Sequence, residues 1–155
     1  MLRKSDLIKL RGTAGRDRRL LLEAVLWLAC ARITILTVPF RWTTRLLAMK
    51  PSGETEPTQA FVTSPAFAPR ARWALKVAAA RTPWKSNCLT KAVAGAGMLR
   101  LRQIASTLAL GVAKSTSERG GMRAHAWLRC GGIIVTGGAG HKQYNVIATF
   151  TSSSK

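Results

Sequence analysis

The sequence predicts an α+β fold, with N-terminal helices followed by a cysteine-bearing helix packed on an antiparallel sheet. In the first two thirds of the chain, apolar residues recur every three or four positions, which is typical of helices. After residue 106 the apolar residues alternate with small or polar ones, which is typical of strands. Helices first and strands second is the order of α+β domains, not of folds that alternate helices with strands.

Four segments have helix-forming composition and helical spacing of apolar residues. They cover residues 16–37, 41–49, 66–81 and 88–100. Pro39 ends the first segment and Pro83 separates the last two, because proline lacks the N–H that a helix interior needs. Residues 50–65 are rich in proline and polar residues and predict a linker. We therefore expect two parts, a helical N-terminal region with its linker over residues 1–65 and a core over residues 66–155.

Four strands are expected in the C-terminal third of the chain, separated by turns that contain glycine. They cover residues 107–113, 123–130, 133–136 and 144–150. The turn between the second and the third strand is Gly131-Gly132. Because antiparallel strands can be joined by short turns, these segments predict an antiparallel meander.

The chain is strongly basic, with 25 Lys and Arg against 6 Asp and Glu and a net charge of +19. Such a field attracts polyanions, whether nucleic acid, anionic lipid or an acidic peptide. No nucleic-acid-binding motif accompanies the charge, so we expect no nucleic-acid partner. The cysteines and histidines lack metal-ligand spacing, and residues 137–142 lack the Gly-Lys and Ser or Thr of a phosphate loop. Neither a metal nor a cofactor is therefore expected.

The apolar segment 20–38 is long enough to span a membrane. Glu23 and Arg32 interrupt it, however, and each is costly at the centre of a bilayer. Glu23 and the long leading region with two aspartates also disfavour a signal peptide. A helix buried in the domain or docked on a partner is the favoured interpretation, with a peripheral membrane contact left open. Three cysteines, an odd number, suit a reducing compartment, so we expect a cytoplasmic protein.

Cys88 and His125 form the candidate catalytic pair. Cys88 stands at the start of a predicted helix, where the partial positive charge of the helix end favours a thiolate. His125 lies on a predicted strand and can take or return a proton. Since a strand places alternate side chains on opposite faces, Cys130 points away from His125 and is excluded as its partner. Cys30, in the apolar helix, is expected to be a small buried hydrophobe.

Five short motifs follow one another between residues 83 and 150. They are Pro83-Trp84-x3-Cys88-Leu89, Ser106-Thr107-Leu108-x-Leu110-Gly111-Val112, Ala124-His125-Ala126-Trp127-Leu128, Val135-Thr136-Gly137-Gly138 and Tyr144-x3-Ile147-Ala148-x-Phe150. In order and spacing the chain resembles, over roughly residues 16–150, the lasso-peptide leader peptidases, which are bacterial cysteine proteases with a transglutaminase-like fold. The resemblance implies a transglutaminase/papain-like core in which Cys88 is the nucleophile and His125 the base.

The resemblance also implies a substrate and partners. Members of that family remove the leader from a ribosomally made precursor peptide, which frees the core N-terminus. A separate ATP-dependent, asparagine-synthetase-like cyclase then closes the ring on the freed amine. The region before residue 66 lacks the β-hairpin pattern of a fused leader-recognition domain. A separate leader-binding protein is therefore implied as well.

The sequence departs from this family in its third catalytic residue, which the family provides as an aspartate on the strand after the histidine. No Asp or Glu follows Glu118 in this chain. An orienting group is still needed to fix the imidazole tautomer. Asn145 is the first candidate, as in a Cys-His-Asn arrangement, and Thr136 or a main-chain carbonyl are the others. The backbone N–H of Cys88 is the expected oxyanion donor.

Two other functions remain compatible with the sequence. Another transglutaminase-like amidase or acyltransferase would use the same cysteine and histidine on a different substrate. A small basic nucleic-acid-binding protein would use the charge and need neither residue. Loss of activity on alkylation of Cys88 would favour an enzyme, whereas steep salt dependence of nucleic-acid affinity would favour the binding protein.

Overall fold

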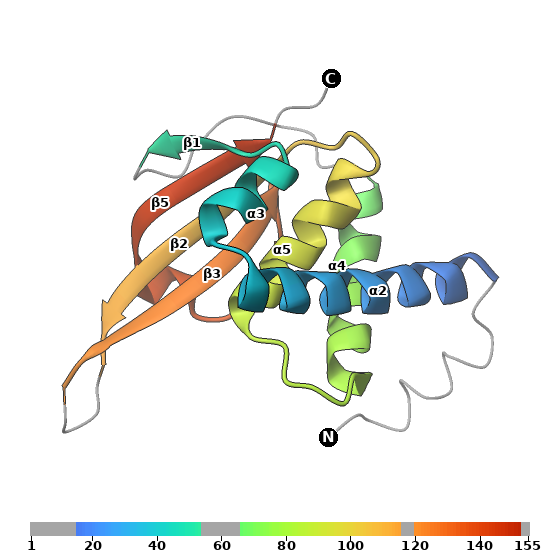
Figure 1. Cartoon of the computed structure of the whole chain (residues 1–155), viewed down its shortest axis with the longest axis horizontal. Coiled ribbons are helices and arrows are strands. Elements are labelled where there is room, and N and C mark those ends of the chain that lie inside the picture. Colours follow the sequence, from blue (N-terminus) through green and yellow to red (C-terminus); the bar gives the residue numbers. More distant parts are fainter. Residues whose placement is uncertain (1–14, 54–65, 116–119, 153–155) are drawn as a thin grey trace.

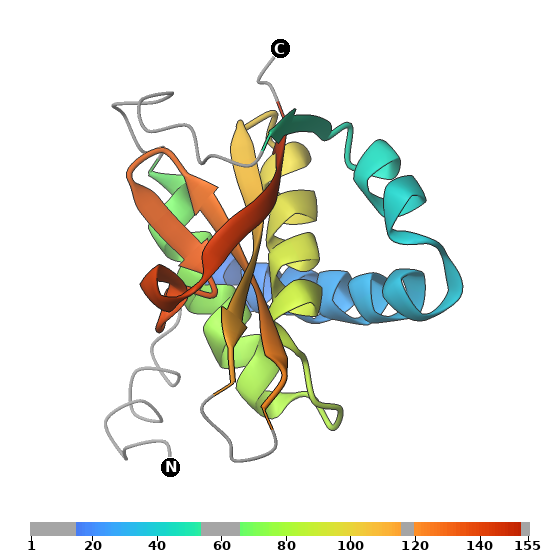
Figure 2. The same ribbon diagram turned by 90° about the vertical axis from the view of Figure 1, so that its left-hand side faces the viewer.

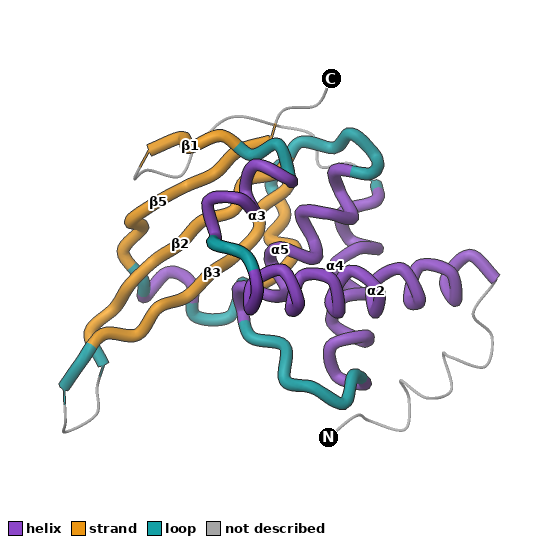
Figure 3. The backbone as a smooth tube through the Cα atoms, in the orientation of Figure 1, coloured by secondary structure: helices purple, strands orange, loops and turns teal. Residues whose placement is uncertain are grey.

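The computed structural model of the chain describes residues 15–53, 66–115 and 120–152, and it has the predicted α+β architecture (Figure 1). The described helices are α2 (Gly15–Thr37), α3 (Phe40–Leu46), α4 (Phe67–Arg81) and α5 (Cys88–Arg100), with a 3-10 turn η1 (His141–Gln143). The described strands are β1 (Lys50–Gly53), β2 (Ser106–Lys114), β3 (Met122–Cys130), β4 (Ile133–Thr136) and β5 (Asn145–Ser152). The four helices therefore precede β2, β3, β4 and β5 along the chain, and Figure 3 distinguishes the helices from the strands by colour.

The five strands form one antiparallel sheet in the order β1-β5-β2-β3-β4. The last strand, β5, pairs with β2 and not with β4, so the prediction of a simple meander is wrong. The alternating pattern identifies a strand and its buried face, but it does not say which neighbour the strand will pair with. β2 lies in the middle of the sheet, and both of its edges are paired by longer strands than β4.

Two further differences concern the residues between α2 and α4. α3 ends at Leu46, earlier than the predicted helix 41–49, and Ala48 has a left-handed backbone with φ of +48°. Residues 50–53, predicted as the start of a linker, form the exposed edge strand β1. Pro51 is tolerated there because an edge strand need not donate every backbone N–H. Residues 54–65 of the predicted linker lie outside the described residues.

The helices form two layers on one side of the sheet. α4 and α5 pack on the sheet, and α2 packs across both of them, which Figures 1 and 2 show from two sides. One buried cluster joins all three layers, with Leu28 from α2, Leu75 from α4 and Leu128 from β3 among its members. The division of the chain at residue 65 stays a prediction, although residues from both sides of it share this cluster.

α2 buries only one of its faces. Leu20, Ala24, Leu28 and Ala31 are its buried residues. The opposite face presents Leu22, Leu26, Ile33 and Leu36, which are between 61% and 73% exposed. α2 is the one helix in the described part of the chain that is long and apolar enough to cross a membrane, and 22% of its apolar stretch is buried in the domain.

The two acidic residues of α2 are held by arginines from elsewhere in the domain. Asp17 accepts from Arg70 of α4 at 3.1 Å. Glu23 accepts from both terminal nitrogens of Arg102 at 2.6 and 2.8 Å, and the Arg102 guanidinium also lies 3.9 Å from the centre of the Phe67 ring. The hydrogen bond and the charge of Glu23 raise the pKa of Arg102 further above its usual range. These pairs fix the position of α2 across α4 and α5.

Candidate functional site

Cys88 is the first residue of α5, as predicted, and Asn87 caps this helix. The Asn87 side-chain oxygen accepts hydrogen bonds from the backbone N–H and the hydroxyl of Thr90, each at 2.8 Å. The backbone N–H groups of Cys88 and Leu89 have no backbone acceptor among the described residues. A helix start leaves such donors free, and it carries partial positive charge. The thiol of Cys88 thus stands beside free backbone donors, which is the arrangement that can bind an oxyanion.

His125 lies on β3 and is held by a main-chain carbonyl and two aromatic rings. Its Nε2 is 2.7 Å from the carbonyl oxygen of Gly137. Its ring stacks on Tyr144 and on Trp127, with centroid distances of 4.9 and 5.9 Å. Because a carbonyl oxygen can only accept, Nε2 must carry the hydrogen, which leaves the lone pair of a neutral ring on Nδ1. Nδ1 is therefore the atom of His125 that can act as a base.

Cys88 and His125 line the same cleft, which has a volume of about 990 Å³. Its walls come from α4, the loop before α5, the start of α5, β4 and the residues that follow β4, with His125 contributed by β3. No hydrogen bond joins the thiol to the imidazole, and among the described residues the partner of the ring is Gly137. The structure thus brings both predicted residues to one cleft, and no hydrogen bond joins the two groups there.

The two faces of β3 differ as the strand pattern predicts. Ala126, Leu128 and Cys130 belong to the cluster packed against the helices. His125 and Trp127 lie on the other face, where their rings stack and where Trp127 is only 1% exposed. Trp127 is thus a buried packing residue whose ring stacks against the imidazole of His125, and it is not open to a substrate.

The structure gives His125 a neutral orienting group, the Gly137 carbonyl, from among the alternatives that the sequence leaves open. Asn145 is an exposed residue at the start of β5, paired in register with Val112, and it forms no hydrogen bond with His125. A catalytic role for Asn145 stays a prediction. Thr136 lines the cleft, but its buried hydroxyl has no hydrogen-bond partner among the described residues.

No described carboxylate contacts His125, because Asp17 and Glu23 are both engaged by arginines. The other four acidic residues of the chain lie outside the described residues. Within the described ranges the imidazole is therefore oriented without a negative charge. A carbonyl oxygen fixes the tautomer, but it stabilises an imidazolium less than a carboxylate does.

Gly137 can place its carbonyl beside His125 only because it has no side chain. Its φ is +74°, a left-handed conformation that other residues adopt at a cost. A Cβ atom built on it would lie 2.3 Å from the carbonyl oxygen of Ala126 and within 2.9 Å of the backbone of Trp127. The sequence shows this glycine only as the first of a doublet after a strand, so its role was not predicted. The stacking of Tyr144 on His125 was not predicted either.

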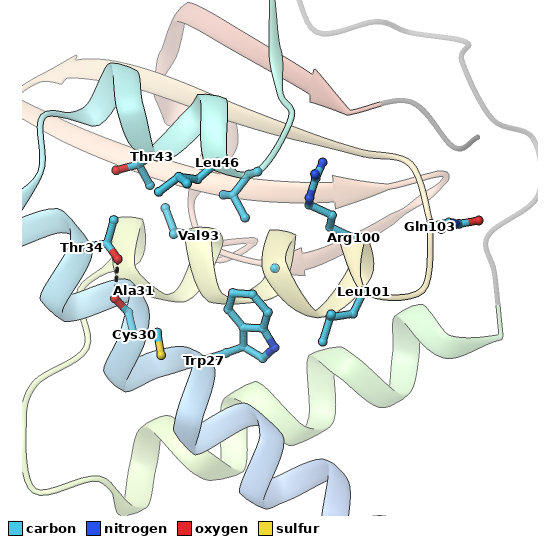
Figure 4. Close-up of a pocket in the computed structure, with 12 residues that line it drawn as sticks. Trp27, Cys30, Ala31, Thr34, Thr43, Leu46, Val93, Arg100, Leu101 and Gln103 are labelled. Atoms are coloured by element: carbon cyan, nitrogen blue, oxygen red, sulfur yellow. Dashed lines mark hydrogen bonds between the residues drawn. The ribbon is translucent and has the colours of Figure 1, made fainter.

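The other two cysteines have different environments. Cys130 is 1% exposed, and burial raises the pKa of its thiol, which keeps it protonated and unreactive. Cys30 is exposed, so the prediction that it is buried is wrong. The cause is that α2 buries one narrow face, and Cys30 lies off it. It lines a second, smaller hollow of about 370 Å³ between α2, α3 and the end of α5, beside Trp27 (Figure 4). The residues lining that hollow include no histidine.

A family model described as transglutaminase-like superfamily matches residues 25–149 of the chain. The match begins within α2, ends within β5 and includes both Cys88 and His125. No curated protein and no solved structure matches the chain significantly. In the described part of the chain, no three His, Cys, Asp or Glu side chains gather in a way that could hold a metal ion.

Proposed function

The chain belongs to the transglutaminase-like superfamily, which points to cysteine-protease or amidase-type activity, and on this basis we propose that it is a leader peptidase. In this proposal it removes the leader from a ribosomally made lasso-peptide precursor. One observation carries the proposal: Cys88 starts a helix at the wall of the cleft that His125 also lines. The order and spacing of the motifs around both residues support the finer assignment.

The reaction assigned to this pair begins with a proton transfer. Nδ1 of His125 accepts the proton of the Cys88 thiol, and the sulfur attacks the carbonyl carbon of the scissile amide. The imidazolium returns the proton to the departing nitrogen as the C–N bond breaks, which frees the amine of the core peptide. Water, deprotonated at Nδ1, then cleaves the thioester and releases the leader carboxylate and the thiol. This sequence requires the thiol and Nδ1 to approach in the substrate complex, where catalytic hydrogen bonds commonly tighten.

The oxyanion of the tetrahedral intermediate is assigned to the start of α5. The free backbone N–H groups of Cys88 and Leu89 are the donors that the described residues provide there. Asn87 caps α5 through its side-chain oxygen, so the NH2 group of the same amide stays available as a further donor beside Cys88. Removal of one donor from an oxyanion hole typically costs roughly 100-fold to 1000-fold in turnover.

The partners follow from the same proposal. A separate leader-binding protein presents the precursor, and an ATP-dependent, asparagine-synthetase-like cyclase uses the freed amine. The protein acts in the cytoplasm, which suits its three free cysteines. The exposed apolar face of α2 serves as a peripheral contact with a membrane or with one of these proteins, because removing exposed apolar surface from water is favourable. No nucleic-acid partner is expected.

The test of the proposal is cleavage of the precursor followed by mass spectrometry. The full-length protein is incubated with the precursor encoded nearest to it, with and without the leader-binding protein encoded beside it. We expect Cys88→Ala to abolish cleavage and to leave the fold intact, because alanine is a good helix former. Cys30→Ala is the matched control, since it removes an exposed thiol outside the cleft and should cleave normally. Cleavage that persists in Cys88→Ala would exclude the mechanism.

A second candidate, a transglutaminase-like amidase or acyltransferase with another substrate, has the same support from the family. It shares the thioester but differs in what resolves it. If the wild-type protein forms a thioester with the precursor and transfers the acyl group to an added amine rather than to water, the acyltransferase is favoured. Release of a leader with a free carboxylate favours the peptidase.

A further inference from the structure

Among the described residues, the side chains that line the proposed catalytic cleft include four cations and no carboxylate. Four basic side chains belong to its wall: Arg72 and Lys76 of α4, Lys85 in the loop before α5, and Lys91 in the first turns of α5. Lys91 follows Cys88 by three residues, a spacing that places two helical side chains on neighbouring parts of one face. The nucleophile itself therefore stands in positive surroundings.

These charges are not neutralised by the part of the chain that the structure describes. The two ion pairs found there are Arg70–Asp17 and Arg102–Glu23, and neither involves a residue of the cleft. The guanidinium of Arg32 donates a hydrogen bond to the backbone carbonyl oxygen of Lys85 at 2.8 Å. This contact brings a fifth cation to the loop before α5. A concave site lined by one sign of charge concentrates ions of the other sign.

Two hydroxyl groups in the same wall lack partners. Thr136 is 7% exposed, and neither its hydroxyl nor the buried hydroxyl of Ser86 has a hydrogen-bond partner among the described residues. A buried polar group without a partner costs roughly 1–3 kcal/mol. Such groups commonly acquire a partner from a ligand or a water molecule. A peptide main chain in the cleft offers the donors and acceptors that they lack.

We propose that this cleft selects an acidic peptide segment, one that carries Asp or Glu side chains beside the amide that is cut. The carboxylates of the segment lie against Lys85, Lys91, Arg72 and Lys76, and its main chain reaches the hydroxyls of Ser86 and Thr136. This inference rests on the proposed function, because it names the substrate class of the same cleft. It adds a specificity that neither the family nor the catalytic pair supplies.

The test compares two alkylating reagents of similar size and different charge on the full-length protein. Iodoacetate is an anion and iodoacetamide is neutral, and the same thiolate attacks the CH2 carbon of either reagent and displaces iodide. The ratio of their rate constants at Cys88, resolved by mass spectrometry of the peptides, thus reports the local field and not the nucleophilicity of the sulfur. We expect this ratio to exceed that of a small neutral thiol and to fall as salt is added.

Matched variants separate the cleft from the overall charge. Lys85→Gln with Lys91→Gln removes two cleft cations, and Lys50→Gln with Lys114→Gln removes two exposed cations on β1 and β2 that do not line the cleft. From Coulomb's law at moderate separation near a surface, the first pair should lower the ratio about threefold to fivefold and the second by less than about 1.5-fold at low salt. Equal ratios in both variants and the wild type would overturn the proposal, as would an equal fall in both variants.

A binding measurement tests directly whether the cleft prefers an acidic peptide. A fluorescent peptide of alternating glutamate and glycine, and its glutamine counterpart, are titrated against Cys88→Ala by fluorescence anisotropy. We expect the glutamate peptide to bind at least about tenfold more tightly, and the cleft variant to lose this preference while the surface variant keeps it. Equal affinity for the two peptides would refute the assigned substrate class.

These readouts do not depend on precursor cleavage. If the alkylation ratio depends on the cleft lysines but the precursor is not cleaved, the acidic-ligand site is supported and the leader-peptidase function is refuted. If the precursor is cleaved but the alkylation ratio is the same with and without the cleft lysines, the peptidase function is supported and the proposed selection of acidic peptides is refuted.

Discussion

Gly137→Ala is expected to destabilise the fold and to displace the hydrogen-bond partner of His125, the proposed catalytic base. The residue follows β4, and its carbonyl oxygen lies 2.7 Å from Nε2 of His125. An added Cβ would meet the carbonyl oxygen of Ala126 at 2.3 Å and the Cβ and Cα of Trp127 at 2.8 and 2.9 Å. These atoms belong to the backbone of β3, or are attached directly to it, and β3 is paired on both sides, with β2 and β4. They cannot turn aside as the end of a flexible side chain would.

Two costs add in this substitution. The left-handed backbone, with φ of +74°, costs a residue with a Cβ about 1–2 kcal/mol. Overpacking against atoms that cannot move typically adds roughly 1–3 kcal/mol. The free energy of unfolding should therefore fall by about 2–5 kcal/mol, which lowers the Tm of a domain of this size by roughly 5–15 °C.

Relief of the clash must move Gly137 away from β3, and its carbonyl moves with it. His125 then loses the acceptor that holds the hydrogen on Nε2 and leaves Nδ1 free for the thiol. A wrongly oriented or tautomerised histidine disables a thiol or hydroxyl nucleophile even when both residues are present. We expect precursor cleavage by Gly137→Ala to fall at least roughly tenfold at temperatures where the variant is folded.

Two neighbouring glycines provide controls. Gly140 has a similar φ of +72°, but the nearest atoms to an added Cβ lie 3.7 and 3.9 Å away, in the Gln143 side chain. Gly140→Ala should therefore show the conformational cost alone. Gly138 has no positive φ, and an added Cβ would meet only the side chain of Ile134, at 3.3 and 3.6 Å. Gly138→Ala should be close to the wild type in stability.

The assay is chemical denaturation followed by circular dichroism, together with the rate of precursor cleavage at a temperature where the variant is folded. A structural defect alone would lower stability and leave the cleavage rate of the folded protein unchanged. Loss of the orienting carbonyl should also lower that rate, because Nδ1 of His125 is no longer held as the free base. If Gly137→Ala is no less stable than Gly140→Ala and cleaves at the wild-type rate, the assigned role of this glycine is wrong.

Three further predictions concern stability, thiol chemistry and surface binding. Arg102→Lys should lower the free energy of unfolding by about 1 kcal/mol, because lysine cannot bond Glu23 through two nitrogens or stack as a plane; urea titration measures this. A thiol reagent should modify Cys30 rapidly in the native protein and Cys130 only on unfolding, because burial raises the pKa of Cys130; equal rates by mass spectrometry would contradict its burial. Leu26→Ser should weaken sedimentation with anionic vesicles without loss of stability, since Leu26 is 65% exposed; unchanged sedimentation would show that α2 does not contact the bilayer.

Much of the fold could be predicted because local signals and packing agree in this chain. The bounds of α5 match the prediction residue for residue, since Asn87 is a good cap and the helix begins at once after it. β3 and β4 also match closely, because a glycine doublet separates two alternating segments. In each case the short-range pattern that forms the element also buries its apolar side, so tertiary contacts reinforce the local preference.

The rest depended on contacts between residues distant in the sequence. β1 has the composition of a loop and exists because β5 offers it a free edge. Cys30 belongs to an apolar run, yet the layers of the domain bury only one side of that run. The residues at the cleft were predicted by type and position, but the partner of His125 was not, because any residue can supply a carbonyl. Only the path of the chain after β4 decides which carbonyl it is.

The outward apolar face of α2 has a practical consequence for handling the protein. Salt weakens the effects of the positive charge of the protein, but it can strengthen association through this apolar face. At low ionic strength the charge of +19 keeps copies of the chain apart, but it also retains polyanions carried over from a lysate. High salt releases these polyanions. It also shortens the screening length to about 3 Å at 1 M, so the charged copies no longer repel one another at a distance. Sulfate in addition strengthens apolar self-association. The four exposed aliphatic side chains of α2 are the natural contacts for such self-association. Solubility should therefore peak at intermediate chloride and fall in sulfate, so nucleic acid is best removed in chloride before any precipitation step.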